Sequence, residues 1–216
     1  MLIDLHIFID SLNIVLEAKD SFTAGHSDRV ADLAQQLAIS MNYSKDFCEN
    51  IHIAGHLHDI GKVGIPDGIL LKTSKLTCAE FEVIKAHGNI GYEILKNNKG
   101  LGDIPLWVKH HHERFDGKGY PDGLEGEEIP EGSRIIALVD ALDAMLSGRP
   151  YRKQISFAEV IEEIVRCQKT QFDYKVVKGF LNSLFDIKMK NLIKSRFGVN
   201  DNDFELVYKL IKEKYK

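Results

Sequence analysis

Histidine and aspartate recur in this sequence at spacings that place imidazole and carboxylate groups inside a helical protein. The segment HLHDIGK holds His58 and Asp59 side by side, and the segment HHHERFDGKGYP begins with three consecutive histidines. A run of histidines alone does not distinguish a surface patch, a pH-sensitive patch and part of a metal site. The predicted helical face of each residue separates these alternatives.

An α-helix advances about 100° per residue, so spacing from apolar neighbours predicts the side that a residue faces. His58 lies within the apolar arc of its predicted helix, with Asp59 at the margin of that arc. A single histidine on an apolar stripe is usually a core residue with one hydrogen bond. Five such histidines on four predicted helices favour a shared site instead. They are His26, His58, His87, His111 and His112.

The segment IIALVDALDAML, residues 135–146, is apolar except for Asp140 and Asp143. A helix that is apolar all round is buried, and a buried carboxylate is costly unless a cation or strong donors compensate it. The two carboxylates could instead cap a neighbouring helix or pair with Arg149 or Arg152. For Asp140 we favour a metal ligand, whereas for Asp143 both interpretations stay open.

Other polar residues near these segments are not expected to bind metal. His52 and His56 have a spacing that can bind zinc, but only Asp59 offers a third ligand, so we expect two solvated histidines. His110 is expected on the outer face of its helix. Glu113 is expected to orient a ligand through a hydrogen bond rather than to bind metal.

The donor types narrow the choice of metal. Mixed imidazole and carboxylate ligands suit first-row transition metals better than magnesium or calcium. Six or so ligands exceed the needs of one tetrahedral zinc ion. Two metal ions that share a carboxylate would use them all.

The elements that must position these residues are helices. Almost every segment has helical periodicity, and no segment alternates convincingly as a strand. Capping boxes are predicted at Thr77–Glu80 and Ser156–Glu159, Pro105 suits the first turn of a helix that continues through the histidines, and Asp173 suits a cap. Glycine and proline cluster at 61–70 and 116–132, where we expect functional loops.

Composition excludes several classes of function. The 216 residues are 44% hydrophobic and 28% charged, which suits one globular domain, alone or with a small extension. A net charge of −4 and the lack of a basic stripe argue against DNA or RNA polymers as partners. Three widely spaced cysteines indicate a reduced, cytoplasmic protein. The apolar start is interrupted by charged residues, which predicts an amphipathic helix rather than a membrane span.

HDIGK at 58–62, followed by HHERFDGKGYP at 111–121, resembles the HD-GYP proteins, a branch of the HD phosphohydrolase superfamily. The match extends to FTAGHSDRVADLA, IPDGILLKTSKLT, Asp140–Ala144 and RPYR, and covers roughly residues 15–180. It implies an all-α fold, an HD-domain helical bundle with an HD-GYP extension. We expect an amphipathic helix segment at 1–14, the catalytic domain at 15–185 and a helical extension at 186–216.

Characterised members of that family hydrolyse the second messenger cyclic di-GMP, to pGpG or on to GMP. The resemblance implies two metal ions, iron or manganese ahead of zinc or nickel, with Asp59 bridging them. Lys62 would reach the phosphate or its leaving oxygen. Asp143, Arg149 and Arg152 would line the nucleotide pocket. The implied metal ligands are His26, His58, Asp59, His87, His111, His112 and Asp140.

The chemistry follows from these parts. Two metal ions about 3.5–4 Å apart lower the pKa of a shared water and hold a phosphodiester for in-line attack. Lysine and arginine balance the phosphoryl charge. Some members bind a third metal through a carboxylate four residues before the first histidine. Phe22 stands there, with Asp20 and Glu17 further back, so two metals are expected.

Four points stay open. The substrate could be another cyclic dinucleotide or a phosphomonoester. The domain could be a silent module that binds cyclic di-GMP, although none of the implied ligands is missing. The GYP loop could line the substrate cleft, dock onto a GGDEF-type synthase or an adaptor, or be a purely structural turn. Residues 186–216 could form a cap or a homodimer contact.

Overall fold

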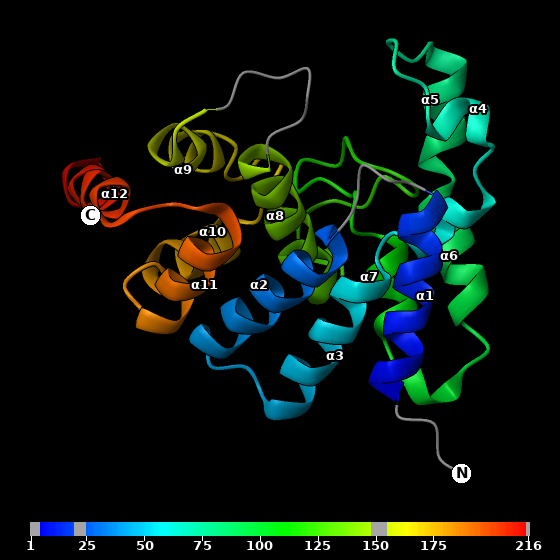
Figure 1. Cartoon of the computed structure of the whole chain (residues 1–216), viewed down its shortest axis with the longest axis horizontal. Helices are drawn as coiled ribbons and strands as arrows, with labels where there is room; N and C mark the ends of the chain where they lie inside the picture. Colours follow the sequence, from blue (N-terminus) through cyan, green and yellow to red (C-terminus); the bar gives the residue numbers. More distant parts are fainter. Residues whose placement is uncertain (1–4, 20–24, 148–154, 215–216) are drawn as a thin grey trace.

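The computed structural model describes residues 5–19, 25–147 and 155–214, and within them it contains helices and two isolated bridges but no strand (Figure 1). The predicted all-α class is therefore confirmed. The α-helices are α1 (Leu5–Lys19), α2 (His26–Ser40), α3 (Lys45–Leu57), α4 (Asp67–Leu70), α5 (Cys78–Lys85), α6 (His87–Leu95), α7 (Ile104–Lys109), α8 (Glu131–Leu146), α9 (Phe157–Arg166), α10 (Tyr174–Ser183), α11 (Ile187–Phe197) and α12 (Asp201–Lys214). Three short 3-10 helices are η2 (Ile60–Gly64), η3 (Lys99–Leu101) and η4 (Gly126–Glu128).

Local capping explains where several helices begin. Thr77 and Ser156 each form the predicted capping box, which satisfies backbone N–H groups that a helix start leaves without partners. Asp173 accepts a hydrogen bond from the backbone N–H of Lys175, and Pro105 lies in the first turn of α7. One boundary was predicted wrongly. Helix α7 ends at Lys109, so the histidines that follow lie in a turn.

The core is built where α2 packs between α3 and α8. Leu33 and Leu37 on α2, and Leu138 and Leu142 on α8, are fully buried. Each such side chain contributes roughly 1.5–3 kcal/mol of burial free energy. On the other side of α3, helix α6 packs against η2 and α7. The elements that carry the candidate site are thus held against one another by apolar contacts.

Helix α1 lies across α3 and η2, with Ile9 and Leu16 buried beneath it (Figure 1). It is unbroken through residue 14, where the boundary of an N-terminal segment was expected. Among the described helices, none is long and apolar enough to cross a bilayer.

The last helices pack onto the body. Helix α11 contacts α2, and α12 contacts α9. Arg196 at the end of α11 donates a hydrogen bond to Asp32 of α2 at 2.5 Å. At the opposite end of the molecule, α4 and α5 project away from the bundle (Figure 1).

Candidate metal centre

The structure brings all seven predicted ligands together as two neighbouring groups. In each group the donor atoms lie within 4.8 Å of one another, as in a metal site. Within the described residues, these are the groups of three or more donors that meet this distance. The groups are His26, His58 and Asp140, and Asp59, His87, His111 and His112.

Asp59 lies between the two groups and presents one oxygen to each. Its Oδ2 lies 3.4 Å from Nε2 of His58 and 3.8 Å from Nε2 of His26. Its Oδ1 lies 3.5 Å from Nε2 of His87. A carboxylate in this position can contribute an oxygen to each of two metal ions, as predicted for a bridging ligand.

Backbone carbonyls fix the tautomers of three histidines. Nδ1–H of His58 donates to Gly55 O at 2.7 Å, and the Nδ1–H groups of His87 and His111 donate to carbonyls three residues earlier at 2.7 and 2.6 Å. A carbonyl can only accept, so the Nδ1 atom must carry the proton. The Nε2 lone pairs then face the centre of the site, which is the orientation used for metal binding.

The donor set fits a cation, because lone pairs converge without a proton between them. Nε2 of His87 lies 3.3 Å from Nε2 of His111. Burial lowers the pKa of both imidazoles, and for His111 the positive charge of neighbouring histidines adds to the effect. Burial likewise lowers the pKa of His112 to about 4. Two neutral lone pairs at this distance repel each other unless a positive ion lies between them.

The first group differs because its imidazole is bound by two carboxylates. Nε2 of His26 lies 3.3 Å from Oδ1 of Asp140, and Nδ1 lies 2.7 Å from Oδ2 of Asp143. Burial disfavours the charged ring, but the hydrogen bonds to Asp140 and Asp143 outweigh it and raise the pKa of His26 to about 10. In the metal-free protein this ring is an imidazolium.

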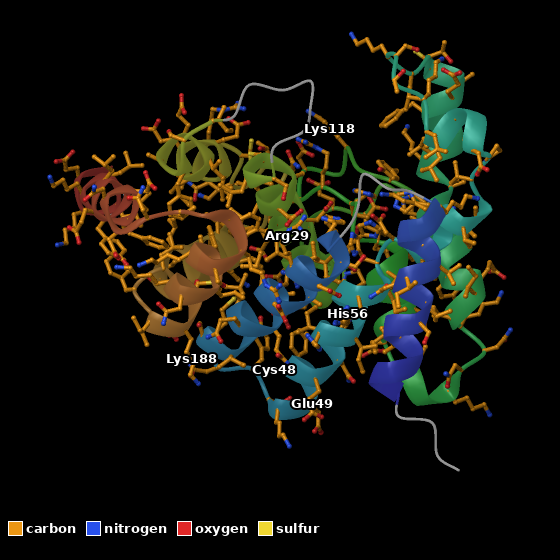
Figure 2. All side chains as sticks on the ribbon, viewed as in Figure 1. Arg29, Cys48, Glu49, His56, Lys118 and Lys188 are labelled. Atoms are coloured by element: carbon orange, nitrogen blue, oxygen red, sulfur yellow. The ribbon has the colours of Figure 1, made fainter. Side chains whose placement is uncertain are left out.

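Arg29 holds Asp143 from the other side. Its Nε–H donates to Asp143 Oδ1 at 2.5 Å, and Nη2–H donates to Oδ2 at 3.1 Å. Asp143 is 1% exposed, so this bidentate pair compensates a buried charge. Figure 2 shows Arg29 on α2 near the middle of the molecule. The structure thus places Asp143 behind His26, where it orients that ring.

Lys62 also belongs to the centre. Its Nζ lies 2.6 Å from Oδ2 of Asp59. Burial would raise the pKa of the Asp59 carboxyl, but the charge of Lys62 and the neighbouring His58 hold it well below its usual range. These contacts favour the anionic form of Asp59 at neutral pH.

A family model described as HD domain matches residues 11–176 of the chain. The chain belongs to the HD domain family. The name refers to the adjacent pair that His58 and Asp59 form at the centre of the site.

Curated relatives resemble this HD domain over most of its length. A cyclic di-GMP phosphodiesterase of Thermotoga maritima is 42% identical over 175 residues, 80% of this chain and 48% of that protein. The cyclic di-GMP phosphodiesterase response regulator RpfG of Xanthomonas campestris pv. campestris is 39% identical, covering 77% and 44%. The 3'3'-cGAMP-specific phosphodiesterase 1 of Vibrio cholerae is 38% identical, covering 82% and 39%. The chain spans less than half the length of these relatives, which confirm the resemblance to the HD-GYP branch.

Solved structures agree on the fold. A crystal structure of a cyclic GMP-AMP-specific phosphodiesterase of V. cholerae has a TM-score of 0.67 at 16% identity, covering 94% of this chain and 53% of that one. The HD domain of the L. monocytogenes phosphodiesterase PgpH, in complex with cyclic-di-AMP, has a TM-score of 0.56 at 20% identity, covering 95% and 98%. These identities establish the HD fold alone.

Hydrogen bonds join the loop that carries the GYP residues of this HD domain to the turn that contains His111 and His112. Glu113 is buried, and its Oε1 accepts the backbone N–H groups of Asp122 at 2.7 Å and Gly123 at 3.0 Å. The expectation that Glu113 orients a ligand was therefore wrong, because both hydrogen bonds hold the loop. A Cβ at Gly119 would lie 2.3 Å from the backbone nitrogen of Arg114, so only glycine permits this close approach.

Three histidines outside the centre are less exposed than predicted. His56 is 8% exposed and bonds Asn13 of α1 at 3.0 Å, while His52 lies 3.4 Å from Asp32. His110 is 6% exposed, and its Nε2 lies 2.9 Å from Asp122. The expectations of solvated rings and of an outer face were wrong, because elements distant in sequence cover these positions.

Some predicted residues lie outside the described part of the HD domain. Arg149 and Arg152, expected to line the nucleotide pocket, are among them. So are Asp20 and Phe22, which bear on a third metal, while the side chain of Glu17 is also outside the description. Arg29 is the supporting residue that the sequence analysis missed. Its signal was its place one turn after His26 on the same helix.

Proposed function

We propose that this HD domain is a metal-dependent phosphodiesterase that hydrolyses cyclic di-GMP to pGpG, GMP or both. The observation that carries the proposal is the position of Asp59, with one oxygen toward each of two imidazole-rich groups. The names of the relatives, and the identity of about two in five residues to the Thermotoga protein, indicate the substrate class.

The proposed ligands are His26, His58 and Asp140 for one ion and His87, His111 and His112 for the other, with Asp59 shared. Two ions held in this way supply an activated water and a charge clamp on a phosphodiester. The chain itself contributes the remaining roles. Lys62, which pairs with Asp59, would donate a proton or a hydrogen bond to an oxygen of the phosphate. Asp143 and Arg29 hold the His26 ring in place. Arg149 and Arg152 remain the predicted contacts to the nucleotide.

Replacement of Asp59 by asparagine tests the proposal directly. The amide nitrogen has no free lone pair to donate to a second metal ion, so one of the two bridging contacts would be lost while the side-chain volume stays nearly the same. We expect hydrolysis of cyclic di-GMP with Fe(II) or Mn(II) to fall by on the order of 10³-fold, measured by chromatographic separation of the products.

The matched control is Asp103→Asn, which alters an exposed carboxylate in neither donor group. It should leave turnover unchanged. Equal rates for wild type and Asp59→Asn, or no turnover of any cyclic dinucleotide by wild type with either metal, would refute the enzyme assignment. The product pattern also decides whether the reaction stops at pGpG.

A second candidate substrate is 3'3'-cGAMP. A relative named as specific for it is 38% identical over 178 residues, close to the identity shared with the cyclic di-GMP enzymes. The same assay with both nucleotides ranks them by kcat/KM. We propose cyclic di-GMP as the preferred one.

Metal uptake by the first group is expected to depend on pH, because His26 must lose a proton. Its pKa is about 10, held there by Asp140 and Asp143 against burial, so the metal-free ring is charged at neutral pH. We expect one proton to be released per ion bound there. Affinity should rise about tenfold per pH unit from neutral pH toward 10. Calorimetry in buffers of different ionisation enthalpy measures this release, and His26→Gln, which has no such proton, should abolish it.

The same shift sets the sign of a stability effect. The folded-state pKa of His26 lies above its ordinary value of 6.5. Its contribution to the metal-free protein is therefore fully present below pH 6.5 and is lost as the pH rises through about 10. A metal-free protein whose melting temperature did not fall over this range relative to His26→Gln would contradict the assignment.

Iron or manganese is the proposed metal, with zinc and nickel as alternatives, because five imidazoles and two carboxylates match first-row ions. The three cysteines are unpaired, in keeping with a reducing compartment, and we propose a cytoplasmic location. We also propose that the GYP loop docks a GGDEF-type or adaptor protein and that residues 186–216 contribute to a homodimer contact. The loop presents the exposed Lys118, and α11 exposes Ile187.

A further inference from the structure

Helix α5 carries an exposed aromatic ring beside the GYP loop. Phe81 is 44% exposed, and no residue of α5 is buried. Among the helices, α5 packs chiefly against its neighbours α4 and α6, and Figures 1 and 2 show it projecting from the body with side chains spread around it. The Phe81 ring therefore contributes little to the core. Its neighbours suggest another role.

Three groups converge at this position. The Phe81 ring lies 6.3 Å from the Tyr120 ring, with an angle of 82° between their planes. Nζ of Lys85 lies 5.1 Å from the centre of the Phe81 ring and 5.6 Å from that of Tyr120. The Tyr120 ring in turn lies 4.9 Å from the ring of His112. Aromatic surface thus runs without interruption from a proposed metal ligand to the edge of the molecule.

We propose that Phe81, Tyr120 and Lys85 form a binding subsite for a guanine base of the substrate, a role that rests on the proposed phosphodiesterase function. A nucleobase is joined to its phosphate through one ribose. With the phosphate at the metal centre, the base reaches the region just beyond His112, where Tyr120 and Phe81 lie. Base stacking on an aromatic side chain is worth roughly 1–3 kcal/mol, which is about fivefold to 150-fold in affinity.

Lys85 would make the subsite prefer guanine over adenine. Guanine has two acceptors on one edge, O6 and N7, whereas adenine has an amino group in place of O6. An ammonium group can donate to both acceptors of guanine but meets a donor on adenine. One proton of Nζ is engaged by Glu82 at 2.6 Å, which leaves two of its three for a ligand.

The test compares GMP, AMP and inorganic phosphate as ligands of the metal-loaded protein by calorimetry. Phe81→Ala is expected to lower the affinity for GMP and for AMP by about tenfold and to leave phosphate binding unchanged. Phe81→Trp, which keeps an aromatic ring at this position, should retain the affinity for both nucleotides. Lys85→Met is expected to lower the affinity for GMP alone. Leu71→Ala, which removes another exposed apolar side chain of the projecting region, is the matched control and should change nothing.

Kinetics separate this subsite from the proposed function. In Phe81→Ala the KM for cyclic di-GMP should rise by about tenfold while metal content, melting temperature and hydrolysis of bis(p-nitrophenyl) phosphate stay the same. Equal GMP affinities in wild type and Phe81→Ala would overturn the subsite even if turnover is normal. A wild type that fails to cleave cyclic dinucleotides, yet binds GMP through Phe81, would overturn the function and support the subsite.

Discussion

Replacement of Gly61 by alanine is expected to abolish metal binding at the second group and to destabilise the fold. Gly61 belongs to the HDIGK motif, and a Cβ built on it would lie 1.9 Å from the carbonyl oxygen of His87 and 2.6 Å from the nitrogen of Gly91. Both are backbone atoms, so no side-chain rotation relieves the contact. Helix α6 must move away from η2 by about 1.5 Å for the Cβ and the His87 carbonyl oxygen to reach ordinary contact distance.

That movement acts on the site because α6 begins at His87. The ring of His87 points at Asp59, whose Oδ1 is 3.5 Å from Nε2, and Asp59 directly precedes η2. Separation of α6 from η2 therefore pulls a proposed ligand away from the shared carboxylate. A misplacement of about 1 Å can cost 10²-fold in activity, and an overpacked contact costs roughly 1–3 kcal/mol of stability.

Two measurements check the Gly61→Ala prediction. Metal content after dialysis should fall by one ion per chain, and urea denaturation should show the lower free energy of unfolding. Gly68→Ala is the matched control, because a Cβ there meets no atom within 4 Å. Full metal content in Gly61→Ala would show that the approach of α6 to η2 does not position the centre.

Helical periodicity predicted the inward face of His26, His58 and His87, because each ring continues the apolar stripe of its helix, whereas His111 and His112 lie in a turn beyond α7. The sequence also singled out Asp140 and Asp143 of α8 as candidate site residues, because a buried helix contains few polar residues. Periodicity also predicted the all-α class and the capped starts at Thr77 and Ser156. These features are local and are encoded within a few turns.

Several of the wrong predictions involve contacts with another element of the fold. His56 lies on the polar side of α3, yet α1 covers it through Asn13, 43 residues earlier. His110 is buried because Asp122, on the returning loop, pairs with it. Asp143 meets Arg29 across a separation of 114 residues. A helical wheel shows which side of a helix is polar, but it does not show which other element covers that side.

The pair formed by Arg29 and Asp143 is expected to make a large electrostatic contribution to the fold and to the first metal group. In Arg29→Met the Asp143 carboxylate stays buried and loses its bidentate partner, which typically costs about 3–5 kcal/mol. Arg29 is itself partly exposed, with 20% of its side-chain surface accessible, so water screens the pair and the lower end of the range, about 3 kcal/mol, is expected.

Arg29→Met should also weaken metal binding by the first group. Asp143 contacts the ring of His26 at Nδ1 over 2.7 Å, and without its arginine partner this carboxylate is held less firmly in that position. Loss of an outer partner of this kind typically lowers metal affinity by about 10–100-fold. The second group, whose His87 and His111 rings are oriented by backbone carbonyls, should keep its ion.

A double-mutant cycle separates the pair from general disruption. Asp143→Asn removes the charge but retains an oxygen for His26, so Arg29→Met combined with Asp143→Asn should recover much of the stability lost in Arg29→Met alone. Arg196→Met is the matched control. It breaks a pair with Asp32 in which both side chains are substantially exposed, at 43% and 30%, and should cost less than about 1 kcal/mol. Additive losses in the double mutant would show that Arg29 stabilises the protein through packing, and that the ion pair does not hold His26 in place.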